Sequence, residues 1–164
     1  MRSRNKGFSY IELIIVLAIM AIMIGLVSIT IGTVTRANVN RGAEKLVSTL
    51  NLSRSTSMSH GSADGLLEIT FDGNRYYYQI GGTGERVDFL ASPSTVTYTL
   101  EGDATTQIGI PVGATLRIAY RPSTGSQMPW AYGTSMVETI TLSNGDKTAV
   151  IKLYPETGKS ELLY

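Results

Sequence analysis

The sequence predicts an α+β protein in which one long N-terminal helix, membrane-spanning in its first half, packs on an antiparallel β-sheet. Two observations carry this prediction. An uncharged apolar run extends from Leu13 to Ile31, and from Leu66 onward the spacing of apolar residues changes from a helical period to the alternation typical of strands. About 105 residues follow the helix, which is enough chain for one small hydrophobic core.

The apolar run is long enough to cross a bilayer. It has 19 residues, of which only Gly25, Ser28 and Thr30 are not plainly apolar. As a helix it would extend about 28 Å, close to the hydrocarbon thickness of a membrane. Three of the first seven residues are basic, which favours a cytoplasmic N-terminus.

Three interpretations of this N-terminal segment compete. A cleaved signal peptide is disfavoured because its apolar region would be shorter and would end at a small-residue cleavage site. A plain single-span anchor leaves Glu12 unexplained, since carboxylates in membrane segments are costly and usually functional. The third interpretation is a processing signature, and it depends on the relative positions of three residues. Gly7 ends a short basic leader, the bulky Phe8 follows it, and Glu12 is the fifth residue counted from Phe8.

Residues 7–13 in this register resemble the processing signature of type IV pilins and pseudopilins. The resemblance implies that a prepilin peptidase cleaves between Gly7 and Phe8 and then methylates the new amino terminus of Phe8. It also implies that Glu12 of an incoming subunit pairs with the Phe8 amine of a subunit already in the filament, because both charges need a partner in an apolar core. The chain then divides into a leader (1–7), a transmembrane and filament-core helix (8–35) and a globular pilin-like domain (36–164).

Beyond the apolar run, the helix is predicted to continue as an amphipathic segment to about Met58. Its apolar residues share one helical face, which we expect to pack on the rest of the domain. They are Val39, Ala43, Leu46, Val47 and Leu50. Charged residues, including Arg41 and Arg54, populate the other faces. The small and polar residues from 55 to 65 are expected to end the helix.

Strands are predicted where short alternating segments lie between turn signals. They are residues 66–71, 75–80, 95–100, 115–120, 138–142, 148–154 and 159–163. Turns at residues 72–74 and 143–146 each join two of these strands as a hairpin, and the last three strands form an antiparallel meander. Residues 81–84 are interpreted as a structural glycine loop, because they lack the lysine and helix of a phosphate-binding loop. Residues 126–133, which include Trp130, are interpreted as an apolar loop.

The order of these elements loosely resembles the H-type minor pseudopilins of type II secretion. The resemblance implies a structural subunit of a type IV pilus-like or pseudopilus filament, inserted in the cytoplasmic membrane with its globular domain outside. Implied partners are the prepilin peptidase, other pilin or pseudopilin subunits, the inner-membrane assembly platform and the lipid bilayer. The alternative is a membrane-tethered surface module for adhesion or DNA uptake. An enzyme is not expected, because no acid–base pair accompanies a nucleophile.

The composition argues against metal sites, cofactors and a nucleic-acid partner. The chain has no Cys and one His, so no zinc-thiolate site, cysteine nucleophile or His-based metal cluster is expected, and no cofactor is predicted. Asp103 and Asp146 are too isolated in the sequence to predict a calcium site. Although Arg117 and Arg121 flank Tyr120, the formal net charge of +1 argues against a nucleic-acid partner.

Three further groups have structural interpretations. His60 is expected to be exposed or to cap the helix C-terminus, where a cation is favourable. Asp64, Glu68 and Asp72 are spaced by four and are interpreted as one solvated strand face rather than a metal site. At least one of the tyrosines at 76–78 is expected to lie in the core, because these residues alternate faces on a strand.

Overall fold

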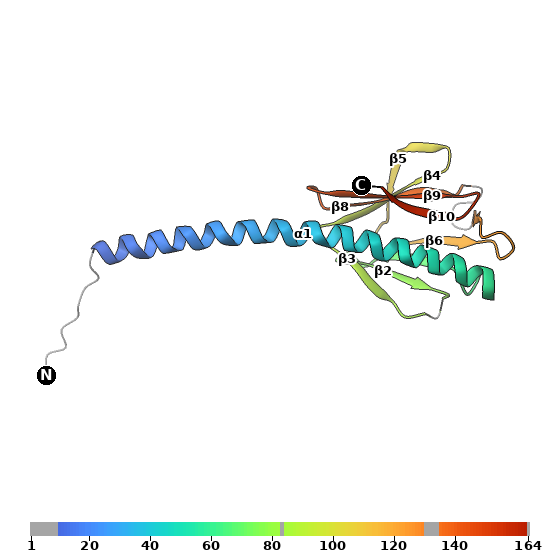
Figure 1. The fold of residues 1–164 in the computed structure, drawn as a ribbon, viewed down its shortest axis with the longest axis horizontal. Coiled ribbons are helices and arrows are strands. Elements are labelled where there is room, and N and C mark those ends of the chain that lie inside the picture. The colour runs from blue at the N-terminus through green and yellow to red at the C-terminus, as the bar shows by residue number, and fades with distance from the viewer. Residues whose placement is uncertain (1–9, 83, 130–134, 164) are drawn as a thin grey trace. The chain divides into compact units, whose positions relative to one another are not determined.

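The computed structural model describes residues 10–82, 84–129 and 135–163, with residues 24–37 described by their backbone alone. Within these ranges the chain forms one helix, α1 (Tyr10–His60), followed by ten strands (Figure 1). The predicted α+β class is therefore confirmed. The chain divides into two compact units, Met1–Thr35 and Arg36–Tyr164.

In the first unit, every described residue belongs to α1. Among the described residues, no helix combines the length and the apolar character needed to span a membrane.

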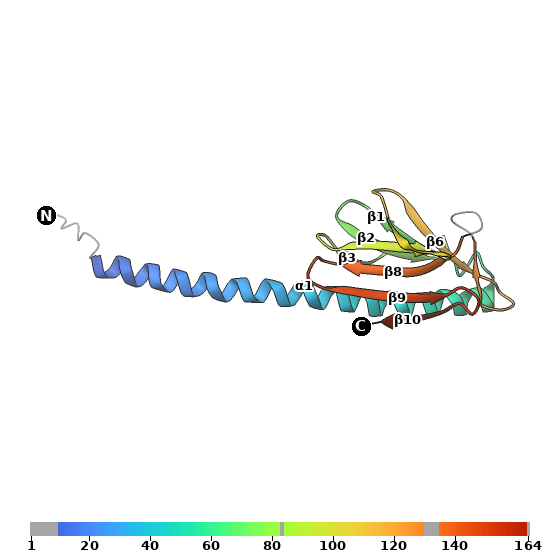
Figure 2. The ribbon, with the colours of Figure 1, turned by 90° about the horizontal axis from the view of Figure 1, so that it is seen from above.

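In the second unit, the strands form two antiparallel sheets rather than the single sheet that was predicted (Figure 2). The first sheet has the order β3-β2-β1-β6-β7 and the second has the order β10-β9-β8-β4-β5. The bounds are β1 (Leu67–Phe71), β2 (Arg75–Ile80), β3 (Val87–Ala91), β4 (Thr95–Leu100), β5 (Asp103–Gly109), β6 (Thr115–Tyr120), β7 (Gln127–Met128), β8 (Val137–Ser143), β9 (Thr148–Tyr154) and β10 (Lys159–Leu163). Each sheet has one apolar face, and burying both faces requires two layers.

Both predicted hairpins are present. β1 pairs with β2 from Leu67↔Ile80 to Phe71↔Tyr76, and β8 pairs with β9 from Thr139↔Lys152 to Ser143↔Thr148. β10 then pairs with β9, which completes the predicted C-terminal meander.

Three strands were not predicted, because each is short or lacks a buried alternation of apolar residues. β5 is exposed on both faces except at Ile108, so its sequence has no buried period of two. β7 has only two residues and lies in the segment that was interpreted as a loop, but its pairing with β6 buries Gln127. Trp130 and the other residues of that segment up to 133 lie outside the described ranges. β3 is short and carries a register shift against β2 at Tyr76/Tyr77.

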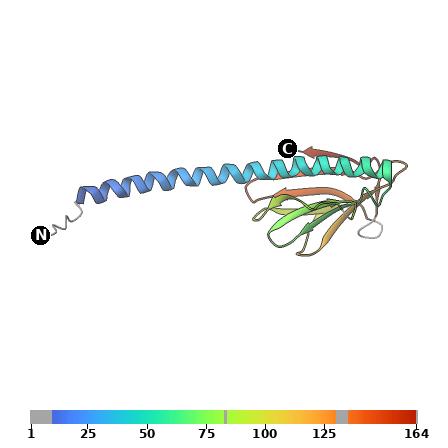
Figure 3. The same cartoon turned by 90° about the horizontal axis from the view of Figure 1, so that it is seen from below.

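The helix face predicted to be apolar does enter the core. Val39, Ala43, Leu46 and Leu50 have no exposed surface, and Val47 packs against the same cluster. Residues from the inward faces of both sheets complete this cluster, including Ile69 from the first sheet and Ile140 from the second. Figure 3 shows the C-terminal half of α1 running along the strands. Burial of this stripe, at about 25 cal/mol per Å² of apolar surface, fixes the helix to the sheets.

Toward its C-terminus, the buried stripe of α1 changes from apolar to small and polar. Ser53 and Ser57 are fully buried there, and Ser53 Oγ donates a hydrogen bond to the backbone oxygen of Gly65. A methyl group at Gly65 would lie 2.1 Å from Ser57 Oγ. Small side chains and a glycine therefore let the chain return closely past the helix before β1 begins.

Arg54 was predicted to lie on a charged outer face, but it is half-buried between two loops. Its Nε donates to the backbone oxygen of Gly125 at 3.1 Å, in the loop between β6 and β7. Gly158, in the turn between β9 and β10, lies against the same two residues. The guanidinium thus joins the helix end to one loop from each sheet, and its buried contacts could not be inferred from local spacing.

Replacing Gly158 by Ala should destabilise the second unit by about 3 kcal/mol. Gly158 has a φ of +66°, and an added Cβ would lie 1.8 Å from Gly125 O. The matched control is Gly102→Ala, because Gly102 also has positive φ but open space around it. The control should cost only about 1 kcal/mol. Thermal unfolding of the full chain in detergent measures both, and equal losses would contradict the close approach of the two loops.

Candidate functional site

The described side chains at the start of α1 are apolar on every side of the helix. Eleven large side chains between residues 10 and 23 are 47% to 80% exposed. They are Tyr10, Ile11, Leu13, Ile14, Ile15, Val16, Leu17, Ile19, Met20, Ile22 and Met23. Because helical neighbours lie three and four residues apart, these positions cover the whole circumference. This segment has no polar face that could be turned to water.

A helix that is apolar all round is normally buried in a large core or in a membrane. Contiguous exposed apolar surface of this kind marks a site of contact with another molecule or with lipid. The segment therefore requires apolar surroundings, and the described part of its own unit consists of this helix alone.

Glu12 is the only charged residue between Tyr10 and Met23. It lies in the first turn of α1 and is exposed. Its carboxylate is near the positive end of the helix dipole, an arrangement worth about 0.3–1 kcal/mol at an exposed helix N-terminus. The fold thus places one negative charge at the N-terminal end of an apolar cylinder. Gly7 and Phe8 lie outside the described residues, so cleavage and methylation at these positions stay predictions.

The same segment matches a known family model. Residues 2–28 match the model of the prokaryotic N-terminal methylation motif. These residues carry the type IV pilin and pseudopilin signature. The match covers the signature's three predicted site residues, Gly7, Phe8 and Glu12. Comparison with curated proteins gave no match, and comparison with solved structures gave none either.

Asp64, Glu68 and Asp72 were predicted to share one strand face, but they lie in three different segments. Asp64 lies in the turn that follows α1, Glu68 lies in β1, and Asp72 lies in the β1–β2 turn. Glu68 accepts a hydrogen bond from Arg117 Nε at 2.8 Å across the β1–β6 pair. Among the described residues, no three His, Cys, Asp or Glu side chains are grouped as a metal site would require.

The other singled-out residues occupy structural positions. His60 is the last residue of α1, and its Nδ1 lies 2.7 Å from Ser59 Oγ. Tyr76 is buried in the core, as predicted for at least one of the three tyrosines, and its ring stacks on Phe71. Tyr120 has no exposed surface, so its ring cannot stack on a nucleic-acid base.

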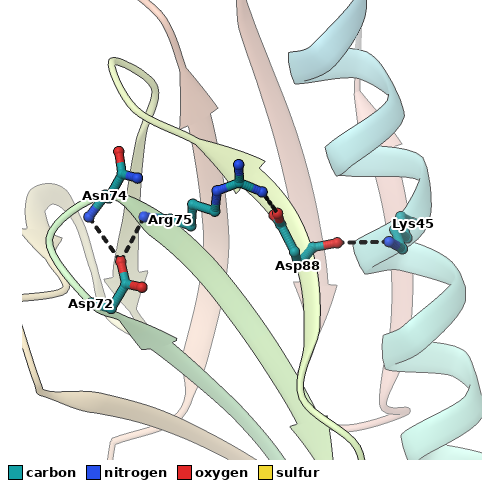
Figure 4. A network of polar contacts seen from close by, with 5 residues as sticks. All are labelled: Lys45, Asp72, Asn74, Arg75 and Asp88. Atoms are coloured by element: carbon teal, nitrogen blue, oxygen red, sulfur yellow. Dashed lines mark hydrogen bonds and ion pairs between the residues drawn. The ribbon is translucent and has the colours of Figure 1, made fainter.

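A polar network links the β1–β2 turn to α1 (Figure 4). Asp72 Oδ1 accepts hydrogen bonds from the backbone N–H groups of Asn74 and Arg75. Arg75 forms an ion pair with Asp88 of β3, and Lys45 of α1 donates to the Asp88 backbone oxygen at 2.7 Å. The turn signal at residues 72–74 predicted the hairpin but not these contacts of the Asp72 carboxylate. The links through Asp88 join distant segments and had no local signal.

The Asp72 contacts predict a pH-dependent loss of stability. The N–H groups of Arg75 and Asn74 hold the pKa of the Asp72 carboxyl below its ordinary value. Its stabilising contribution is therefore present above the ordinary pKa of 3.8 and lost as pH falls through the lowered value.

Asp72→Ala should lower the Tm of the full chain at neutral pH, and the difference from the unsubstituted protein should shrink as the medium is acidified below about pH 4. Thermal unfolding across a pH series measures this difference. Asp64→Ala is the control, because Asp64 is also an exposed turn aspartate but caps no turn among the described residues. A Tm difference for Asp72→Ala that stays constant at acid pH would contradict the capping role.

Proposed function

We propose that this protein is a structural subunit of a type IV pilus-like or type II secretion pseudopilus filament, with no enzymatic activity of its own. The observation that carries the proposal is the combination found at residues 10–23. An all-round apolar helix with a single carboxylate in its first turn lies within the pilin and pseudopilin signature. Such a helix needs apolar surroundings both before and after assembly. A filament subunit meets two such environments in succession, the membrane and the filament core.

The first surroundings are lipid. Before assembly the subunit is held in the cytoplasmic membrane by residues 8–35, with its N-terminus inside and residues 36–164 outside. The basic residues of the leader favour this orientation. Prepilin peptidase then removes residues 1–7 and methylates the amine of Phe8.

The second surroundings are the same segments of other pilin or pseudopilin subunits. Apolar helices can slide along one another, so apolar contact alone does not set an axial register. The Phe8 amine of one subunit and the Glu12 carboxylate of the next would set it, since a charge left unpaired in an apolar core is costly. The inner-membrane assembly platform is the partner that moves subunits from lipid to filament.

The second unit supports the role of a filament subunit with a surface domain, and we place it among the minor pilins or pseudopilins because the order of its elements loosely resembles that group. Its described part is a compact α+β domain in which the helix stripe Val39 to Leu50 packs on the sheets. This domain is attached to the apolar segment through one continuous helix. The filament can therefore display the domain at its surface while the N-terminal segment makes the core.

Replacing Glu12 by Ala should leave membrane insertion intact but reduce incorporation into filaments by at least about a hundredfold. An amine left unpaired in an apolar core costs roughly 3–5 kcal/mol. Fractionation of sheared filaments from cells that carry the cognate assembly machinery measures this ratio. Glu44→Ala is the matched control, because Glu44 is an exposed glutamate on the same helix.

Normal incorporation of the Glu12→Ala protein would contradict the proposed pairing. If that protein also displayed a working surface domain without any filament, the membrane-tethered module for adhesion or DNA uptake would be the better account.

A further inference from the structure

A basic cleft lies between α1 and the edge strand β3 in the second unit. It has a volume of about 460 Å³ and is lined on the helix by Asn38, Arg41 and Lys45. These positions are spaced by three and four and so share one helical stripe. Residues 88–91 of β3 form the opposite wall. At Gly42 the helix approaches β3 so closely that an added Cβ would lie 2.9 Å from Phe89 O.

The charge of this cleft is positive because its one carboxylate is already neutralised. Asp88 pairs with Arg75 (Figure 4), which leaves Arg41 and Lys45 as the remaining charges of the lining. The bond from Lys45 to the Asp88 backbone oxygen holds its ammonium group in place without cancelling its charge. Neither Arg41 nor Lys45 takes part in the two ion pairs found among the described residues.

An acidic hollow of about 250 Å³ lies at the end of β4 and the β9–β10 turn. It is lined by Glu101 and Glu156 together with Tyr154, Pro155 and Thr157. Asp103 lies two residues beyond Glu101, across the exposed turn that joins β4 to β5. The side chain and backbone N–H of Thr106 and those of Thr105 lower the pKa of Asp103, which keeps it ionised. None of these three carboxylates belongs to the two ion pairs of the described residues.

The register of the second sheet places the cleft and the acidic hollow at opposite ends of the same unit. Beside the cleft, Gly42 lies against Leu142, which pairs with Val96 near the start of β4. The hollow follows Leu100, at the end of β4. Val96 and Leu100 are separated by about 13 Å along the strand. The two charged surfaces therefore cannot meet within one copy of the chain.

We propose that the acidic hollow of one copy, with Glu101 and Glu156, docks at the basic cleft of a second copy, with Arg41 and Lys45. The proposal rests on the filament function above and names one contact between its surface domains. The second copy is favoured as the occupant because the chain itself carries a surface of complementary charge. A contact between two different surfaces is heterologous, so it repeats from copy to copy and builds an open chain unless the rotation between copies closes a ring.

Engineered cysteines test the direction of this contact, since the natural chain has no cysteine. Asn38→Cys labels the basic cleft, and Ala104→Cys, near the start of β5, labels the neighbourhood of the acidic hollow. Both positions are exposed. The two full-length proteins are mixed in detergent under mild oxidation. The expected result is a mixed disulfide dimer in about tenfold excess over dimers from either protein alone. Its yield should fall at high salt, because exposed charge pairs are screened. Equal yields in all three samples would overturn the proposal.

Charge reversal tests the named residues. Arg41→Glu with Lys45→Glu in the Asn38→Cys protein should lower the mixed dimer about tenfold, equivalent to about 1.4 kcal/mol. Glu101→Lys with Glu156→Lys in the Ala104→Cys protein should restore it, and these changes leave the Asp103 turn contacts in place. The control is Arg86→Glu with Lys147→Glu, which changes the net charge equally outside the cleft. Loss of cross-linking in the control as well, or failure of the reversed pair to restore it, would overturn the proposal, provided that thermal unfolding shows all variants folded.

Failure of this contact is distinguishable from failure of the filament function. Cleavage between Gly7 and Phe8 by prepilin peptidase should be the same for the Arg41→Glu, Lys45→Glu protein and the unsubstituted chain. Normal cleavage with no directional cross-link would overturn the docking contact alone. A directional cross-link in a chain that the peptidase does not cleave would retain the contact and remove the filament function.

Discussion

Residues 10–23 must be kept out of water, and the proposed membrane insertion and filament assembly both depend on this constraint. Apolar side chains surround this part of α1 on every side and are largely exposed in the single chain. Because the helix has no polar face to present to water, other molecules must cover its apolar side chains. Lipid satisfies the constraint without specificity. In the proposed filament, packing among subunits would satisfy it equally well and would let the carboxylate of Glu12 determine how the subunits align.

The same helix meets a different requirement after residue 36. There an apolar stripe runs from Val39 to Leu50, and its residues are buried or packed against the core formed with the two sheets. The stripe continues through Ser53 and Ser57, where small side chains allow the chain to turn back at Gly65. The single helix α1 is thus apolar on all sides at residues 10–23 and amphipathic after residue 36. The charged surfaces of the domain are arranged around this amphipathic part, with Lys45 and Asp88 joining α1 to the edge of the first sheet.

Features encoded by local spacing could be predicted from the sequence, whereas features that depend on distant contacts could not. The stripe on α1, the hairpin around residues 72–74 and the C-terminal meander each follow from periodicity and turn residues. The strands β5 and β7 were missed because β5 has no buried period and β7 is only two residues long. The division into two sheets was missed because it depends on pairings between distant strands, β1 with β6 and β4 with β8. The burial of Arg54 depends on Gly125, which is 71 residues away. At the candidate site, the pilin signature could be found from Gly7, Phe8 and Glu12 because it is a fixed local register.

The most direct test of the central claim is the intact mass and N-terminal sequence of the full chain, extracted from membranes of cells with and without a prepilin peptidase. We expect a peptidase-dependent start at Phe8, with a mass larger by one methyl group than that of the cleaved, unmethylated chain. A start at Met1 in both cells would contradict it, because Phe8 would then have no free amine with which Glu12 could pair.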